Sequence, residues 1–351
     1  MSVENKDKDV VPAIGAGEHA LAFKIALAAA AGFTLGHLLG WDFPFLPSLI
    51  AVQLLSSGAS LDIKRAFGFV VLMAIGCSVS LFISLIFADR PLALVLAVGI
   101  LIFLEFWALA RGKAAAAIFL ITTSFVPLMA VSSLELADAL VHDLVVGSIL
   151  ALLLIFFVNA LIPGERASRP KDDTEAVPDS GDVATALANT AVLMSLFIYF
   201  MGAGTPTSII VIMVTAITIL QQSAIAGRGA AFGLVMGNIA GGLAATAAYL
   251  LVTLLPSPGF LFLVVLFFAL VFAAKIGAGS ATAAIYSVGA ATFLTVLGLG
   301  LSPLPQDSGT IFFSRVSTVI VAALYTIGVA SVLRWLLVER SSSNGQEQAS
   351  K

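Results

Sequence analysis

The chain has 351 residues, of which 60% are hydrophobic and 11% are charged, and its formal net charge is −3. A soluble domain carries charge on about a quarter of its residues, so this composition excludes a soluble globular protein and predicts one that lies in a lipid bilayer. No basic cluster points to a nucleic-acid partner. The single cysteine, Cys77, excludes an intramolecular disulfide and argues against a thiolate metal site.

Twelve apolar segments follow one another along the chain, and most approach the roughly 20 residues that a helix needs to cross a bilayer. In chain order they cover residues 20–39, 43–58, 65–88, 91–109, 114–131, 143–163, 186–202, 207–222, 229–255, 258–274, 278–300 and 316–338. The segments that begin at residues 43, 114 and 207 are short, and they also fit re-entrant or buried helices. We predict an all-α integral membrane protein with about 12 transmembrane helices.

One short signature occurs twice in the chain, 165 residues apart. The matched positions are Ala66-Phe67-Gly68 with Ala231-Phe232-Gly233, Gly76 with Gly241, Lys24 with Asn189, Gln53 with Thr218, and Gly112 with Gly277. Six segments return the chain to its starting side, so two six-helix repeats would lie parallel around an axis along the membrane normal. The predicted parts are a cytoplasmic tail (1–18), a first repeat (19–163), a linker (164–185), a second repeat (186–338) and a second tail (339–351).

Basic residues in the loops indicate the orientation of the chain, because such residues are retained in the cytoplasm when the loops are short. One side of the predicted spans carries Lys64, Arg65, Arg111, Lys113, Arg166, Arg169, Lys171, Arg228, Lys275, Arg334 and Arg340, together with Lys6, Lys8 and Lys351 in the tails. Arg90 and Arg315 fall on the opposite side. We therefore predict a multi-pass protein of the bacterial inner membrane, with both termini and the linker in the cytoplasm and the 132–142 loop outside.

Three features occur together in the order of a known family. Lys24 places a basic residue in the first span, residues 62–68 lead into a glycine-rich third span, and residues 227–233 repeat that pattern in the second half. Over nearly all of residues 19–338 the chain thereby resembles the fusaric acid resistance and aromatic acid exporter family. The resemblance implies an exporter of small aromatic carboxylates or related toxic compounds that works with a periplasmic adaptor protein. The chain departs from better-known members in lacking their sizeable cytoplasmic domain, so it resembles a compact, membrane-only version.

Basic side chains near the cytoplasmic side are candidates for binding an anionic substrate. A charge in the hydrocarbon region costs about 2.5–3.5 kcal/mol, so a charged residue retained there is a functional candidate. Lys24 lies about one turn inside the first span, where its ammonium group could pair with a substrate carboxylate; its long stem would equally let it snorkel to the headgroups. Arg65 and Arg228, at the cytoplasmic ends of the third and ninth spans, could attract anionic substrates, although they also fit topology determinants.

Glu105 is the only carboxylate that the sequence places well within an apolar span. A carboxyl group that gains and loses a proton there would couple transport to a proton gradient, and we predict this role for it. The alternative is an ion pair with Arg111, Lys113 or Lys24. The neighbouring Trp107 is a candidate for stacking on an aromatic substrate, although packing in the core or at the membrane interface is the commoner role of such a residue.

Thr123 lies in the fifth span, within residues 122–127, where hydroxyl groups accompany a helix-breaking proline. Carbonyl groups freed by the proline could line a binding site with Thr123. The alternative is a kink whose carbonyls are capped by Thr123 and Ser124. At the repeat spacing Glu105 falls on Leu270, so the second half does not duplicate the carboxylate.

Glycines recur at helical spacing in the third and ninth spans. They are Gly68 and Gly76 in the third span and Gly229, Gly233, Gly237 and Gly241 in the ninth. Small residues on one helix face let two backbones approach closely. We therefore predict that these two spans pack tightly, either against each other or against another subunit of a homo-oligomer.

The sequence favours a transporter over an enzyme. His19, His37 and His142 lie at or outside span boundaries, no two at metal-ligand spacing, and we expect no catalytic, metal or cofactor site. The chain also has no phosphate-binding loop of the ATPase type, so transport would use an ion gradient or an external motor. We predict an efflux transporter that exchanges small aromatic or lipophilic organic acids for protons. The alternatives are a passive organic-anion channel and a membrane scaffold that assembles the adaptor without moving substrate.

Overall fold

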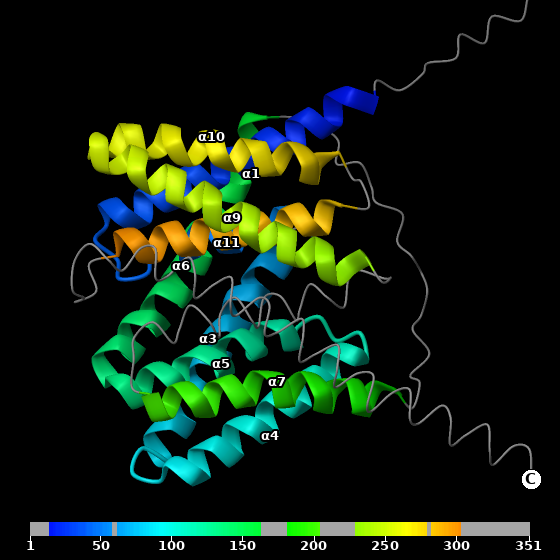
Figure 1. Cartoon of the computed structure of the whole chain (residues 1–351), viewed down its shortest axis with the longest axis vertical. Coiled ribbons are helices and arrows are strands. Elements are labelled where there is room, and N and C mark those ends of the chain that lie inside the picture. The colour runs from blue at the N-terminus through cyan, green and yellow to red at the C-terminus, as the bar shows by residue number, and fades with distance from the viewer. Residues whose placement is uncertain (1–13, 58–61, 163–180, 204–228, 279–281, 303–351) are drawn as a thin grey trace, which may run out of the picture.

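The computed structural model describes residues 14–57, 62–162, 181–203, 229–278 and 282–302. Within these ranges the chain forms ten α-helices (Figure 1). They are α1 (Ile14–Leu38), α2 (Leu46–Ser56), α3 (Ile63–Ile86), α4 (Pro91–Ala110), α5 (Ala116–Ser132), α6 (Leu134–Leu161), α7 (Gly181–Ala203), α9 (Gly229–Leu254), α10 (Pro258–Gly277) and α11 (Ala283–Leu301). The predicted spans 207–222 and 316–338 lie outside the described residues.

Eight of the described helices are long and apolar enough to cross a membrane, and α2 and α5 are shorter apolar helices. Their outward faces are apolar as well. On α4, for example, the exposed side chains of Leu92, Leu96 and Ile100 recur every four residues, which places them on one helix face. A face of this kind suits lipid and not water, so the chain is a multi-pass membrane protein.

The helix bounds lie within about three residues of the predicted spans except at four starts: α1 begins about six residues before its predicted start, α11 begins about five residues after its own, and the other two are α6 and α7. Helix α6 begins at Leu134, so most of the predicted 132–142 loop is helical, and α7 begins at Gly181, inside the predicted linker. The hydroxyl oxygen of Ser133 caps α6 by accepting a hydrogen bond of 3.2 Å from the N–H of Glu135. The hydropathy pattern missed the starts of α6 and α7 because the first turns of these two helices are polar. Polar turns resemble loops on a hydropathy scale.

The helices pack in two groups (Figure 1). In the upper group of Figure 1, α1 packs along α10 and α9 packs along α11; in the lower group, α5 packs against α3 and α4, and α7 packs along α4. Helices α2 and α6 link the groups, since α2 contacts α1, α6 and α11 and α6 contacts α1, α3 and α5. The first helix of each half of the chain therefore lies against helices of the other half.

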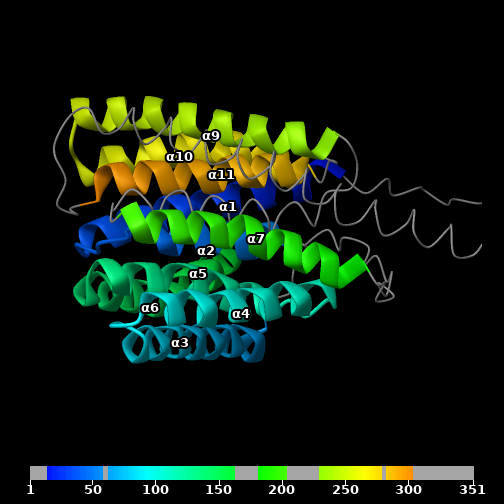
Figure 2. The same cartoon turned by 60° about the horizontal axis from the view of Figure 1, so that its bottom comes forward.

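The helices run side by side, with alternating direction (Figure 2). The connections α1–α2, α3–α4, α5–α6 and α9–α10 lie at one end of the molecule, and the α4–α5 connection lies at the other. That other end, where α3 begins and where α4 and α10 end, carries Lys64, Arg65, Arg111, Lys113 and Lys275. We call it the basic end.

The buried face of α4 recurs in α10 at a spacing of 167 residues. The matched buried positions are Leu94 with Leu261, Val98 with Val265, Ile102 with Ala269, Glu105 with Phe272, and Phe106 with Ala273. Glu105 therefore corresponds to the buried Phe272 and not to Leu270, which is 38% exposed. The spacing of 165 residues holds for the glycines of α3 and α9, and the second half is two residues longer between those helices and the next ones.

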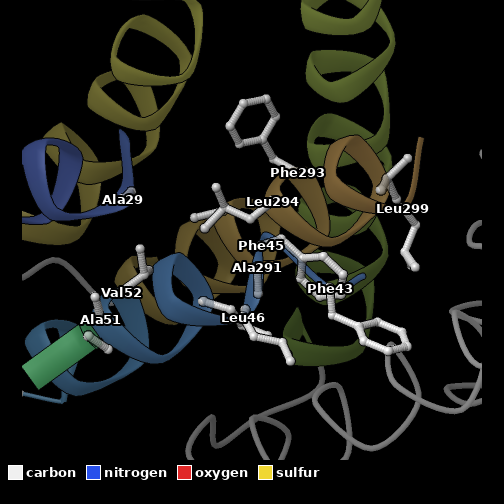
Figure 3. Packing of buried hydrophobic residues seen from close by; sticks show 14 of the residues in the cluster. Ala29, Phe43, Phe45, Leu46, Ala51, Val52, Ala291, Phe293, Leu294 and Leu299 are labelled. Carbon is white, nitrogen blue, oxygen red and sulfur yellow. The ribbon is translucent and has the colours of Figure 1, made fainter. Parts of the chain in front are cut away.

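The connection between α1 and α2 is part of the core. Phe43 and Phe45 are both fully buried, and Figure 3 shows them with Ala291 and Leu294 of α11. A Cβ atom on Gly298 of α11 would meet the side chain of Phe45. The connection therefore holds α11 close to α2, at the end of the molecule opposite the basic end.

Candidate functional site

Three polar side chains from three helices meet inside the lower group. Glu105 of α4 is 9% exposed, and Ser80 of α3 and Thr123 of α5 are fully buried. The Thr123 hydroxyl donates to Glu105 Oε1 at 2.7 Å, and Ser80 Oγ lies 3.5 Å from Thr123 Oγ1. A threonine hydroxyl has one proton, so Ser80 is the donor toward Thr123. We call Ser80, Thr123 and Glu105 the polar cluster.

The inward face of α3 determines how closely Ser80 approaches α5. Its buried residues are Ala66, Met73, Gly76, Cys77, Ser80 and Ser84, and most of them follow the three-and-four spacing of one helix face. A Cβ atom on Gly76 would lie only 2.7 Å from Thr122 Oγ1, so the glycine permits this approach. Ser80, one turn further along α3, then reaches Thr123.

Pro127 affects the cluster through the backbone of α5. Proline has no N–H, so Pro127 cannot donate to the carbonyl of Thr123, four residues earlier. The Thr123 side chain does not cap a carbonyl of its own helix, because it donates to Glu105, whereas the Ser124 hydroxyl donates to Leu120 O at 2.5 Å. Leu120 O is not the carbonyl that Pro127 leaves without its partner, so the predicted capping of that carbonyl by Thr123 or Ser124 is not what the structure shows.

Glu105 forms no ion pair within the part of the chain that the structure describes. Oε1 accepts from Thr123, and Oε2 is buried without a hydrogen-bond partner among the same residues. Within the described residues, Glu105 therefore does not form the alternative ion pair with Arg111, Lys113 or Lys24. The polar cluster holds the carboxylate with neutral hydroxyl groups.

Trp107 is half-buried, and one face of its ring is covered by Arg111. The Arg111 guanidinium carbon lies 3.6 Å from the ring centroid, a cation–π contact between residues one helical turn apart. The ring also packs against the hydrophobic core. Stacking of Trp107 on a substrate stays a prediction, and such stacking would need the face that Arg111 now covers or the ring edge.

The basic candidates lie in different surroundings. Lys24 is 5% exposed within α1, so its side chain is covered by protein and does not reach the surface as snorkelling would require. Arg65 is exposed in the first turn of α3, at the basic end. Arg228 lies outside the described residues. Lys24 belongs to the upper group and Glu105 to the lower group, so the structure does not bring these two charges together.

In the upper group an aromatic side chain, Phe272, stands at the position that corresponds to Glu105. Phe272 packs against Phe293 of α11, with ring centroids 6.1 Å apart. A polar contact in that group joins α9 and α11, where the Thr292 hydroxyl donates to Asn238 Oδ1 at 2.6 Å. Among the described residues Glu105 therefore has no equivalent at the matched position of α10.

A second buried carboxylate was missed by the sequence analysis. Asp143 of α6 is 3% exposed; its Oδ2 accepts a hydrogen bond of 2.9 Å from the N–H of Phe43, and its Oδ1 lies 3.1 Å from His142 Nδ1. The same connection is held on its other side by Ser302, whose hydroxyl donates to Asp42 O at 2.6 Å. Asp143 stood at the edge of a predicted span, where hydropathy gave no sign of burial. Its contacts indicate that it anchors the α1–α2 connection.

Replacing Asp143 by alanine is expected to destabilise the protein by about 2 kcal/mol, because it leaves the buried N–H of Phe43 without its charged acceptor. Thermal unfolding of the purified protein in detergent measures this. The matched control is Asp138→Ala, an exposed aspartate on the same helix, for which we expect a change within about 0.5 kcal/mol. Equal stability of the two variants would show that Phe43 and Phe45 hold the connection without Asp143.

These features define a multi-pass membrane protein, helical in the part of the chain that the structure describes, with a buried polar cluster around one carboxylate. The region from α1 to α6 is similar to a family described as a protein of unknown function (DUF2955), whose model matches residues 21–158. No curated protein and no solved structure matches the chain. The family similarity therefore covers the helices that supply the polar cluster and assigns no activity to them.

Proposed function

We propose that the chain is a twelve-helix transporter of the bacterial inner membrane, made of two parallel six-helix repeats with both termini in the cytoplasm. The recurrence of the buried face of α4 in α10 supports the repeats, as does the reciprocal packing of α1 on α10 and of α7 on α4. Parallel repeats are a common architecture of secondary transporters. The basic end supports the orientation, since basic loops are retained in the cytoplasm.

Its proposed activity is the export of small aromatic or lipophilic organic acids in exchange for protons. The observation that carries this proposal is Glu105, a carboxylate covered by protein in an apolar helix, with one oxygen unpartnered among the described residues. Retaining an ionisable group at such a position is costly, and such groups mark ion and proton pathways. The substrate class rests on the resemblance of residues 62–68 and 227–233 to the aromatic acid exporters.

Proton and substrate would bind in different helix groups. Lys24, buried in α1, supplies a positive charge for a carboxylate in the upper group, while Glu105 takes the proton in the lower group. Arg65 and Arg228 would raise the local concentration of anions at the cytoplasmic entrance. Rocking of one group against the other about α2 and α6 would link the two binding events.

The test is uptake of labelled hydroxybenzoate and fusaric acid into inside-out vesicles that contain the chain. We expect uptake when the vesicle lumen is made acidic, and loss of uptake when a protonophore collapses the gradient. Lys24→Gln should lower uptake at least about tenfold, a loss of about 1.4 kcal/mol of substrate interaction. Lys275→Gln, on the exposed surface of α10, should not.

Other outcomes would contradict the proposal in distinguishable ways. Uptake that ignores the gradient would favour the organic-anion channel. Absence of uptake, together with capture of a periplasmic adaptor protein by the chain, would favour the scaffold.

A further inference from the structure

We propose that the polar cluster of Ser80, Thr123 and Glu105 is a binding site for one sodium ion, which competes with the proton at Glu105. The inference rests on the proposed function, because both assign the coupling ion to Glu105. It goes further in naming the ligand set and the class of ion that the site accepts.

The cluster offers only oxygen atoms as ligands. Ser80 Oγ, Thr123 Oγ1 and Glu105 Oε1 form a connected row, with separations of 3.5 and 2.7 Å, and Oε2 of Glu105 has no hydrogen-bond partner among the described residues. Hydroxyl and carboxylate oxygens are ligands of hard cations. The fold brings these ligands together in the protein interior, because the three residues come from three helices and are all at least nine-tenths buried.

A backbone carbonyl beside the cluster lacks its usual helical partner. Pro127 has no N–H to give to the carbonyl of Thr123. In secondary transporters, carbonyls released by a helix break are among the groups that coordinate sodium ions and protons. Thr123 thus brings a hydroxyl and a backbone oxygen to the same level of α5.

The net charge of the polar cluster favours a monovalent cation. The polar cluster contains one carboxylate and two neutral hydroxyl groups, so an ion of charge +1 leaves it neutral. A divalent ion would leave an uncompensated positive charge in a buried site, which costs several kcal/mol. Sodium therefore fits this set better than magnesium or calcium.

Besides Glu105, titratable groups lie on two of the helices packed against α4 and just after its C-terminal end. They are Cys77, buried on α3; Lys64 and Arg65, exposed at the start of α3; Asp182 and the exposed Tyr199 on α7; and Arg111 and Lys113, which follow α4. Helix α5 contributes none. Protonation of Glu105 removes the negative charge of the site, so sodium and the proton exclude each other there.

The experiment measures binding of radioactive sodium to the purified full-length protein in detergent. We expect saturable binding of one ion per chain that weakens as the pH is lowered and that potassium displaces poorly. Thr123→Val should weaken binding at least about tenfold, and Thr123→Ser, which keeps the hydroxyl, should restore it. Ser78→Ala is the matched control for Ser80→Ala: Ser78 is exposed on the same helix and bonds only to Ala74 O.

The outcomes separate this inference from the proposed function. Absence of saturable sodium binding, binding that ignores pH, or Thr123→Val binding like the unchanged chain would overturn the sodium site. Proton-driven uptake that persists without sodium binding would leave the proposed function standing. Sodium binding together with uptake that no ion gradient drives would keep the site and overturn the transport proposal. Thermal unfolding of each variant without sodium checks that the fold is retained.

Discussion

Replacing Glu105 by glutamine is expected to abolish gradient-dependent uptake of organic acids, reducing it to the level of vesicles that lack the chain. Glutamine has nearly the same shape, and its side-chain oxygen can still accept the hydrogen bond from Thr123. It cannot take up and release a proton, however, so the proposed exchange has no carrier. Uptake into inside-out vesicles with an acidic lumen measures the effect.

The control for this substitution is Glu135→Gln, which changes an exposed glutamate in the first turn of α6 and should leave uptake unchanged. The Glu105 variant should also remain folded, because glutamine keeps the shape of glutamate and removes a buried charge, which is costly to hold in an apolar core. Full gradient-dependent uptake by a folded Glu105→Gln protein would remove Glu105 from the coupling mechanism. Uptake that no longer depends on the gradient would mean that Glu105 sets the coupling but not the pathway.

The sequence predicted the helices best where apolar runs are long and their starts are marked. Pro91 and Pro258 stand at the first position of α4 and α10, where a missing N–H costs nothing, and both helices begin where they were predicted to begin. Helix α6 was predicted to start at residue 143 because its first turns contain Glu135 and Asp138. Hydropathy cannot distinguish a polar helical turn at the membrane surface from an irregular loop.

The candidate site was predicted as single residues and not as an assembly. Glu105 and Thr123 were singled out for their own chemistry, but their contact depends on the packing of α4 on α5, and Ser80 joins them because α3 and α5 approach closely at Gly76. Ser80 was not singled out, although the spacing of Gly76, Ser80 and Ser84 by four residues was a usable signal. A buried polar stripe on one helix indicates which face is inward, and it does not identify the helix that faces it.

The glycine-rich faces of α3 and α9 likewise indicate close packing without identifying the helix that packs against them. Close packing was predicted for both spans, and it holds at Gly76 of α3 but not at Gly68, where a Cβ atom would meet nothing within 4 Å. The predicted contact between the two spans is wrong, because Gly76 faces α5 and Gly237 and Gly241 of α9 face α11. Packing against another subunit stays a prediction. Small residues permit an approach without choosing the neighbour. The choice is made by the rest of each helix face and by the connections that hold the helices together.

The contact between α9 and α11 predicts a large loss of stability for Gly241→Ala. A Cβ atom on Gly241 would meet the backbone oxygen of Gly289, and one turn earlier a Cβ atom on Gly237 would lie 2.5 Å from Ile285 O. A backbone atom cannot rotate away as a side chain can, so the two helices must separate and weaken the Thr292–Asn238 hydrogen bond. Overpacking in a core costs about 1–3 kcal/mol, occasionally more, and we expect the upper part of this range or beyond it.

The measurement is the melting temperature of the detergent-solubilised protein, followed by the size-exclusion profile after heating. Gly68→Ala is the matched control, since a Cβ atom there meets nothing within 4 Å and alanine favours a helix over glycine by about 1 kcal/mol. Its melting temperature should equal or exceed that of the unchanged chain. If the Gly241→Ala and Gly68→Ala proteins had the same melting temperature, the backbones of α9 and α11 would not be in contact at this point. The upper group would then have to pack differently.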